Sequence, residues 1–104
     1  PEALTAFEEF LARYPEHPHA DNAMYWRGEC FLRGGDARRA ISEWEGLLAR
    51  FPLGNKVPDA LLKLSLTHRR LGDIAAAERA VTRLLQEHPD SDAARRVRAE
   101  RQGT

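Results

Sequence analysis

The chain repeats itself at an offset of 37 residues, and no other feature constrains its fold as strongly. Prolines stand at positions 15, 52 and 89, and "LARYP" at 11–15 is echoed by "LARFP" at 48–52. The same offset aligns chemically similar sets of residues: Ala3, Ala40 and Ala77; Phe7, Trp44 and Val81; and Phe10, Leu47 and Leu84. So many matches at one period indicate a repeat protein, whose units stack on one another.

The pattern of apolar residues predicts two helices in each repeat. The second helix carries an apolar stripe with spacings of three and four, made of Ala37, Ala40, Ile41, Trp44, Leu47 and Leu48. The first helix, at about 21–33, places Met24, Gly28 and Phe31 on one face. Proline lacks an amide donor, so it ends each second helix.

Gly34-Gly35-Asp36 lies between the two helices, and Leu71-Gly72-Asp73 repeats this device one unit later. Glycine suits the left-handed residue after a helix, and aspartate caps the next one. We therefore predict an all-α, antiparallel helix-pair solenoid. It forms a single domain over 1–104: the second helix of a truncated repeat at 1–15, repeats at 20–52 and 57–89, and a capping helix at 91–101.

Composition and motifs exclude several kinds of function. Sixteen basic and 16 acidic residues balance, which argues against nucleic acid as a partner, and no apolar run is long enough to insert in a membrane. The chain opens abruptly at Pro1 without a signal peptide, so we expect a piece of a longer protein. No phosphate loop, serine elbow or paired-carboxylate motif is present, and we predict no enzyme and no cofactor.

The histidines and the cysteine have structural interpretations. His17 and His19 lie in a proline-bearing linker without further ligands at standard spacing, so we predict no metal site. Cys30 has no base beside it in the sequence and is expected to pack as a small thiol. His68 and His88 occupy core positions of the repeat and are expected to pack there.

These residues resemble the tetratricopeptide (TPR) pattern. The residues that match it in the first complete repeat are Met24, Gly28, Phe31, Ala40, Trp44, Leu47 and Pro52. The departures are Arg27, Ser65 and His68, which stand at usually apolar, glycine and tyrosine positions. The period is about three residues longer than is usual for this family, and the extra residues follow each proline.

The resemblance implies a protein-binding face on the first helices. In the first complete repeat it places Asn22, Tyr25, Trp26, Glu29 and Arg33 on or beside this concave face. In the second it places there Asp59, Leu62, Lys63, Leu66, Arg69 and Arg70. Exposed aromatic and leucine side chains beside arginines suit a helical or extended peptide. The alternative is that these side chains pack against neighbouring helices.

Phe7, Phe10 and Leu11 suggest self-association. The first helix of their own repeat, which would cover them, is missing from the chain. We therefore expect an exposed apolar face that recruits a neighbour, such as a second copy of the chain.

The linkers carry a narrower resemblance, to the C-terminal domain of the Tol-Pal system TPR proteins, the YbgF/CpoB family. The residues that match are Ala20, Ala23, Tyr25, Trp26, Gly28 and Glu29, followed by Lys56, Asp59, Ala60 and Lys63. The resemblance implies a periplasmic, non-enzymatic scaffold that binds TolA and coordinates outer-membrane constriction with peptidoglycan synthesis during cell division. The alternative is a TPR component of outer-membrane assembly, similar to BamD, or of another envelope complex.

Overall fold

A computed structural model of the chain describes residues 2–15, 17 and 19–103, which form six α-helices and no β-strand. The helices are α1 (Glu2–Arg13), α2 (Ala20–Arg33), α3 (Ala37–Arg50), α4 (Val57–Arg70), α5 (Ile74–Glu87) and α6 (Asp92–Gln102). The predicted all-α class is confirmed. The predicted start of the first helix at Pro1 lies outside the described residues.

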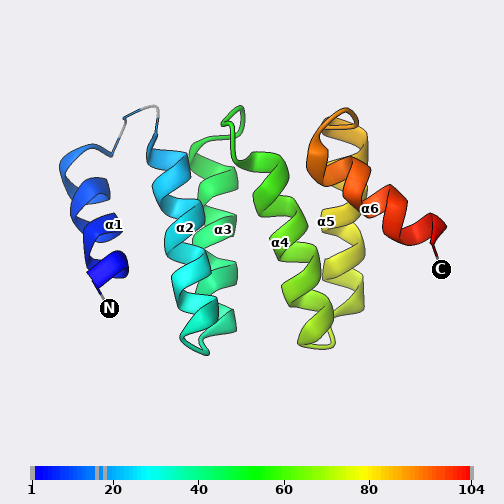
Figure 1. Cartoon of the computed structure of the whole chain (residues 1–104), viewed down its shortest axis with the longest axis horizontal. Coiled ribbons are helices and arrows are strands. Elements are labelled where there is room, and N and C mark those ends of the chain that lie inside the picture. The colour runs from blue at the N-terminus through cyan, green and yellow to red at the C-terminus, as the bar shows by residue number, and fades with distance from the viewer. Residues whose placement is uncertain (1, 16, 18, 104) are drawn as a thin grey trace. The chain divides into compact units, whose positions relative to one another are not determined.

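The helices fall into two compact units, residues 1–57 and 58–104. The first unit contains α1, α2 and α3 side by side, and the second contains α5, α6 and almost all of α4 (Figure 1). The organisation of the whole chain as a single domain, with the repeat boundaries given above, stays a prediction.

The turns inside the helix pairs have the predicted chemistry. Gly35 and Gly72 have φ angles of +89° and +87°, in the region that favours glycine. The side chains of Asp36 and Asp73 each accept a 3.1 Å hydrogen bond from the backbone N–H three residues further on. Each turn therefore ends one helix and caps the next, as predicted.

The core of the first unit is built around Trp44 of α3, whose side chain is fully buried. Its indole Nε1–H donates a 3.1 Å hydrogen bond to the carbonyl oxygen of Tyr25 in α2. Gly28 of α2 lies against the same ring, and a Cβ atom at this position would overlap the indole. A residue without a side chain at 28 therefore allows α2 and α3 to approach closely.

A buried carboxylate fixes the linker that follows α3. Asp21 is only 3% exposed, and its Oδ2 accepts a 3.0 Å hydrogen bond from the backbone N–H of Lys56. The guanidinium of Arg50 donates a 2.9 Å hydrogen bond to the carbonyl oxygen of Pro15. These two bonds tie both linkers of the unit to its helices.

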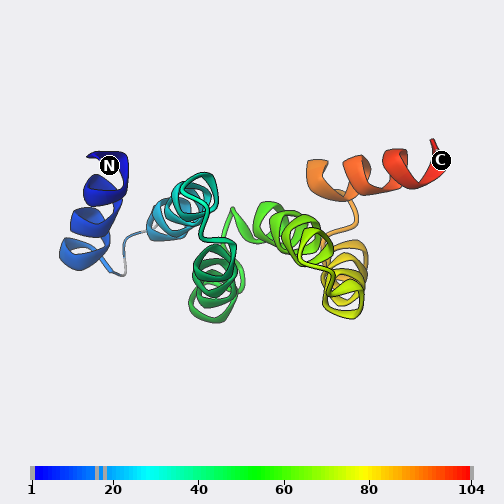
Figure 2. The same cartoon turned by 90° about the horizontal axis from the view of Figure 1, so that it is seen from below.

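In the second unit, α6 runs at a steep angle to α5 (Figure 2). Its first turn is capped by Ser91, whose hydroxyl accepts a 3.1 Å hydrogen bond from Ala94 N–H. The buried residues of α6 are Ala93, Ala94 and Val97, which are the residues predicted to form its apolar side. Its role as a terminal cap stays a prediction.

Candidate functional site

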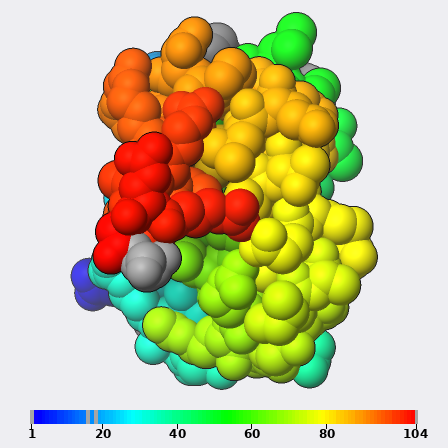
Figure 3. All heavy atoms as spheres, turned by 90° about the vertical axis from the view of Figure 1, so that its right-hand side faces the viewer, coloured from blue at the N-terminus to red at the C-terminus, as the bar shows by residue number. Residues whose placement is uncertain are grey.

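The second unit carries an open groove, here called the α4–α6 groove. Its volume is about 380 Å³, and α4, α5 and α6 all contribute to its lining. Figure 3 shows this face, with α6 on one side and α5 on the other. Its lining includes apolar side chains (Leu62, Leu66, Val81 and Val97) and charged ones (Arg69, Glu78 and Arg101).

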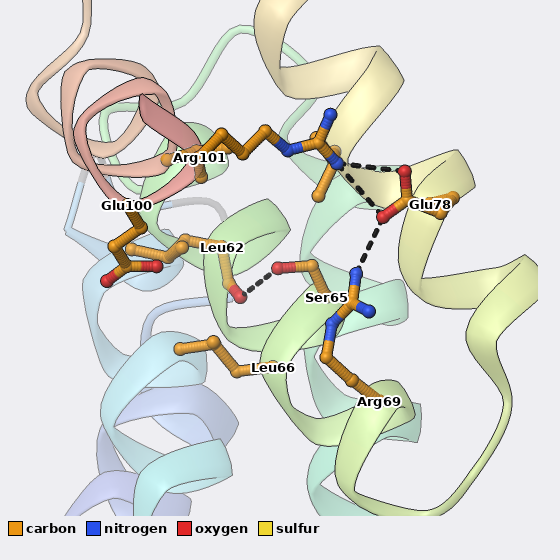
Figure 4. Close-up of a pocket in the computed structure, with 9 residues that line it drawn as sticks. Leu62, Ser65, Leu66, Arg69, Glu78, Glu100 and Arg101 are labelled. Carbon is orange, nitrogen blue, oxygen red and sulfur yellow. Dashed lines mark hydrogen bonds and ion pairs between the residues drawn. The ribbon is translucent and has the colours of Figure 1, made fainter. Parts of the chain in front are cut away.

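A carboxylate between two guanidinium groups ties the three helices together (Figure 4). Glu78 of α5 accepts hydrogen bonds of 2.8 and 2.9 Å from Arg101 of α6. It also accepts a 2.6 Å bond from Arg69 of α4. The hydrogen bonds from Arg101, and then those from Arg69, hold the pKa of Glu78 below its ordinary value of 4.5.

We expect this clamp to weaken in acid. Because the folded state lowers the pKa of Glu78, the clamp stabilises the unit above pH 4.5 and is lost as the pH falls through the folded-state pKa. The difference in melting temperature between the unaltered chain and Glu78→Gln should therefore be constant near neutrality and should shrink as the pH falls below 4.5. A difference independent of pH, measured by circular dichroism, would contradict the clamp. The effect should be small because exposed ion pairs are screened by solvent.

Two leucines of α4 contribute to the apolar part of the α4–α6 groove. Leu66 is 42% exposed, whereas Leu62 is 7% exposed and forms part of the wall. The hydroxyl of Ser65 donates a 2.7 Å hydrogen bond to the carbonyl oxygen of Leu62. Its proton is therefore already used within α4. The groove therefore presents an apolar anchor at Leu66 beside the edge formed by Arg69 and Arg101, a combination that suits protein ligands.

A second hollow lies in the first unit between α1 and α2, and we call it the α1–α2 hollow. Its volume is about 330 Å³, and its lining consists of Ala6, Phe7, Phe10, His19, Asn22, Ala23 and Trp26. Trp26 is 42% exposed, and the Oδ1 atom of Asn22 is buried with no hydrogen-bond partner among the described residues. This hollow is therefore a mainly apolar surface, and the Asn22 oxygen beside it is not accessible from solvent.

The residues predicted for the concave face divide between these places. Leu62, Leu66 and Arg69 line the α4–α6 groove, and Asn22 and Trp26 line the α1–α2 hollow. The other predicted residues lie outside both: Tyr25 and Glu29 are buried, Asp59 and Lys63 are half-buried, and Arg33 and Arg70 are exposed. Whether any of them contacts a partner stays a prediction.

Some lining residues were not foreseen from the sequence. Glu78 and Arg101 are 23 positions apart, and the apolar wall also uses Val81 and Val97. Lys56 places its Nζ atom 5.2 Å from the ring centre of Tyr25 and 5.8 Å from that of Trp26, as cation–π contacts. The TPR resemblance places the protein-binding face on the first helix of each repeat. It therefore did not predict that side chains of α5 or of a linker would contribute.

The prediction of an exposed apolar face on α1 is wrong for one residue. Leu11 is only 8% exposed because α1 packs along α2. Phe7 and Phe10 are half-buried, and both line the α1–α2 hollow.

His17 and His19 are exposed, with ring centres 5.3 Å apart. In the described part of the chain, no group of three or more potential ligands could hold a metal ion.

Cys30 is a half-buried free thiol, and His68 and His88 are half-buried. Among the same residues, no helix combines the length and the apolar character needed to cross a bilayer.

Family models agree with this architecture. Two models described as tetratricopeptide repeat match residues 1–55 and residues 58–101, which together cover nearly the whole chain. A comparison with curated proteins found no match. Repeats of this kind indicate a protein–protein interaction scaffold and are typically non-catalytic.

Proposed function

We propose that this chain, which belongs to the tetratricopeptide repeat family, is a periplasmic scaffold of the Tol-Pal system that binds TolA. In this role it coordinates outer-membrane constriction with peptidoglycan synthesis during cell division. It does so by holding a partner rather than by catalysis.

The resemblance of α2 and the linkers to the Tol-Pal TPR proteins supports this assignment. Several of the matching residues make specific contacts in the structure. Gly28 admits the indole of Trp44, and the backbone carbonyl of Tyr25 accepts its hydrogen bond. Trp26 stacks edge-on against Tyr25 with the ring centres 5.0 Å apart. The motif therefore combines a close helix contact with an exposed aromatic ring.

The α4–α6 groove is the observation that carries the proposal. A segment of TolA would place an apolar side chain on Leu66 and direct an acidic residue toward Arg69 or Arg101. Apolar anchors provide most of the binding energy in such sites, whereas charged edges set the orientation and the rate of association.

We expect Leu66→Ser to weaken the binding of purified periplasmic TolA by about tenfold, because it removes the anchor of the groove. Isothermal titration calorimetry measures the dissociation constant. Leu66 is 42% exposed, so the substitution should leave the helix folded, which circular dichroism checks.

Leu53→Ser is the matched control, since Leu53 is 97% exposed in the linker after α3. It should leave affinity unchanged. Equal losses for the two variants would refute the groove as the site, and no binding of TolA by the unaltered chain would refute the Tol-Pal assignment itself.

A further inference from the structure

The chain itself restrains the two arginines of the α4–α6 groove. The side chains of Arg69 and Arg101 are long, and each is 48% exposed. A long side chain at such an exposed position samples many rotamers unless another group holds it. Both guanidinium groups donate hydrogen bonds to Glu78, at 2.6 Å from Arg69 and at 2.8 and 2.9 Å from Arg101. Glu78 therefore restrains two arginines that come from different helices.

These restrained arginines lie beside the apolar anchor of the groove. Leu62, Leu66 and Arg69 are four and three residues apart, so they follow one another along one face of α4. Figure 4 shows both leucine side chains on one side of the view and Glu78 on the other, where the guanidinium of Arg69 meets it. A segment that packs an apolar side chain on Leu66 therefore brings its neighbouring residues close to the guanidinium groups.

Glu78 does not use up the hydrogen-bonding capacity of Arg69. A guanidinium group carries five N–H groups on three nitrogen atoms. The bond from Arg69 to Glu78 comes from Nη2, so the Nε and Nη1 atoms can donate to another acceptor. An acidic side chain of a partner can therefore bind Arg69 while Glu78 stays in place.

The charges around Glu78 still favour an acidic partner. Two guanidinium groups and one carboxylate leave one net positive charge at this place. Glu100, the other acidic residue in the lining, forms a 3.5 Å ion pair with Arg96, which balances its charge. The groove therefore attracts an acidic side chain even with the carboxylate of Glu78 between its arginines.

We propose that Glu78 is a positioning residue of the α4–α6 groove, which holds the guanidinium groups of Arg69 and Arg101 where an acidic side chain of the bound segment meets them. This inference rests on the groove as the TolA site proposed above. It predicts that removing a negative charge weakens the binding of an acidic segment. The reason is that restrained arginines lose less rotamer freedom on binding than mobile ones do.

Glu78→Gln tests the proposal, because it keeps the size of the side chain and removes its charge. We expect it to weaken the binding of purified periplasmic TolA about threefold to fivefold at neutral pH, as measured by isothermal titration calorimetry. Glu78→Asp keeps the charge and should stay within about twofold of the unaltered chain. The matched control is Glu87→Gln, which removes a 3.2 Å ion pair with Arg83 on the same helix, outside the groove lining. It should leave the affinity unchanged.

The effect of Glu78→Gln should depend on the two arginines. In a chain that carries both Arg69→Gln and Arg101→Gln, the further change Glu78→Gln should no longer weaken the binding of TolA, because no guanidinium is left to position. A role of Glu78 in stability alone would give the same loss in both backgrounds. NMR of the arginine Nε–H groups adds a measurement without TolA: in Glu78→Gln the signals of Arg69 and Arg101 should move toward those of solvated arginine.

Tighter binding of TolA by Glu78→Gln would overturn the proposal, since it would mean that Glu78 competes with the partner for the arginines. An equal loss in the background without the two arginines, or unchanged Nε–H signals, would also overturn it. If the unaltered chain does not bind TolA, the proposed function fails and this inference fails with it. If the unaltered chain binds and Glu78→Gln binds equally well, the positioning role alone is refuted.

Discussion

Trp44→Ala is expected to lower the free energy of unfolding by about 3–5 kcal/mol, since it empties the centre of the first unit. The indole is fully buried, so its removal leaves a cavity that α2 and α3 cannot close without moving. It also deprives the carbonyl oxygen of Tyr25 of a hydrogen-bond donor. Urea denaturation followed by circular dichroism measures the loss.

Trp26→Ala is the matched control, because Trp26 is 42% exposed on the preceding helix. We expect it to cost less than about 1 kcal/mol. A similar loss for the two variants would mean that Trp44 does not organise the core of the unit.

Gly28→Ala is expected to destabilise the chain by about 1–2 kcal/mol, although alanine is the better helix former. The change should gain about 1 kcal/mol from backbone propensity alone. The added methyl group, however, overlaps the indole of Trp44, a rigid neighbour that is fully buried and hydrogen-bonded. Overpacking of this kind costs about 1–3 kcal/mol, and two adjacent helices must separate to accept it.

Gly46→Ala provides the comparison within α3. A Cβ atom there would approach only the terminal Cε of Met24, at 3.3 Å, and this flexible end can move aside. Gly46→Ala should therefore be neutral or should stabilise by up to about 1 kcal/mol. If urea denaturation gave the two glycine variants the same sign, the close contact between residues 28 and 44 would be refuted.

The helix ends, the helix caps and the apolar stripes were predictable from the sequence, because each depends on only a few neighbouring residues. Gly35 and Gly72 have the left-handed backbone that a helix end requires, and Asp36 and Asp73 cap the next helix. The buried stripe of α3, which includes Trp44, follows from spacings of three and four along one helix. Local periodicity reports which face is apolar, so these features need no knowledge of the partner helix.

The candidate sites were only partly predictable. The first-helix pattern found Leu62, Leu66 and Arg69, but not the carboxylate of Glu78 that accepts hydrogen bonds from Arg69. Nor did it distinguish buried Leu62 from exposed Leu66, because the exposure of each side chain depends on the tertiary packing around it.

The sequence by itself determined the repeat, the helix pairs and the residues that end and begin them, because period and capping are local properties of the chain. The tertiary structure decided which apolar side chains stay open. Leu11 is buried against α2, whereas Phe7 and Phe10 remain half-buried at the edge of a hollow. It also brought Glu78 to Arg101 across 23 residues, and Asp21 to the backbone of Lys56 across 35. Contacts between distant residues depend on how the helices pack. No repeating pattern in the sequence indicates this packing.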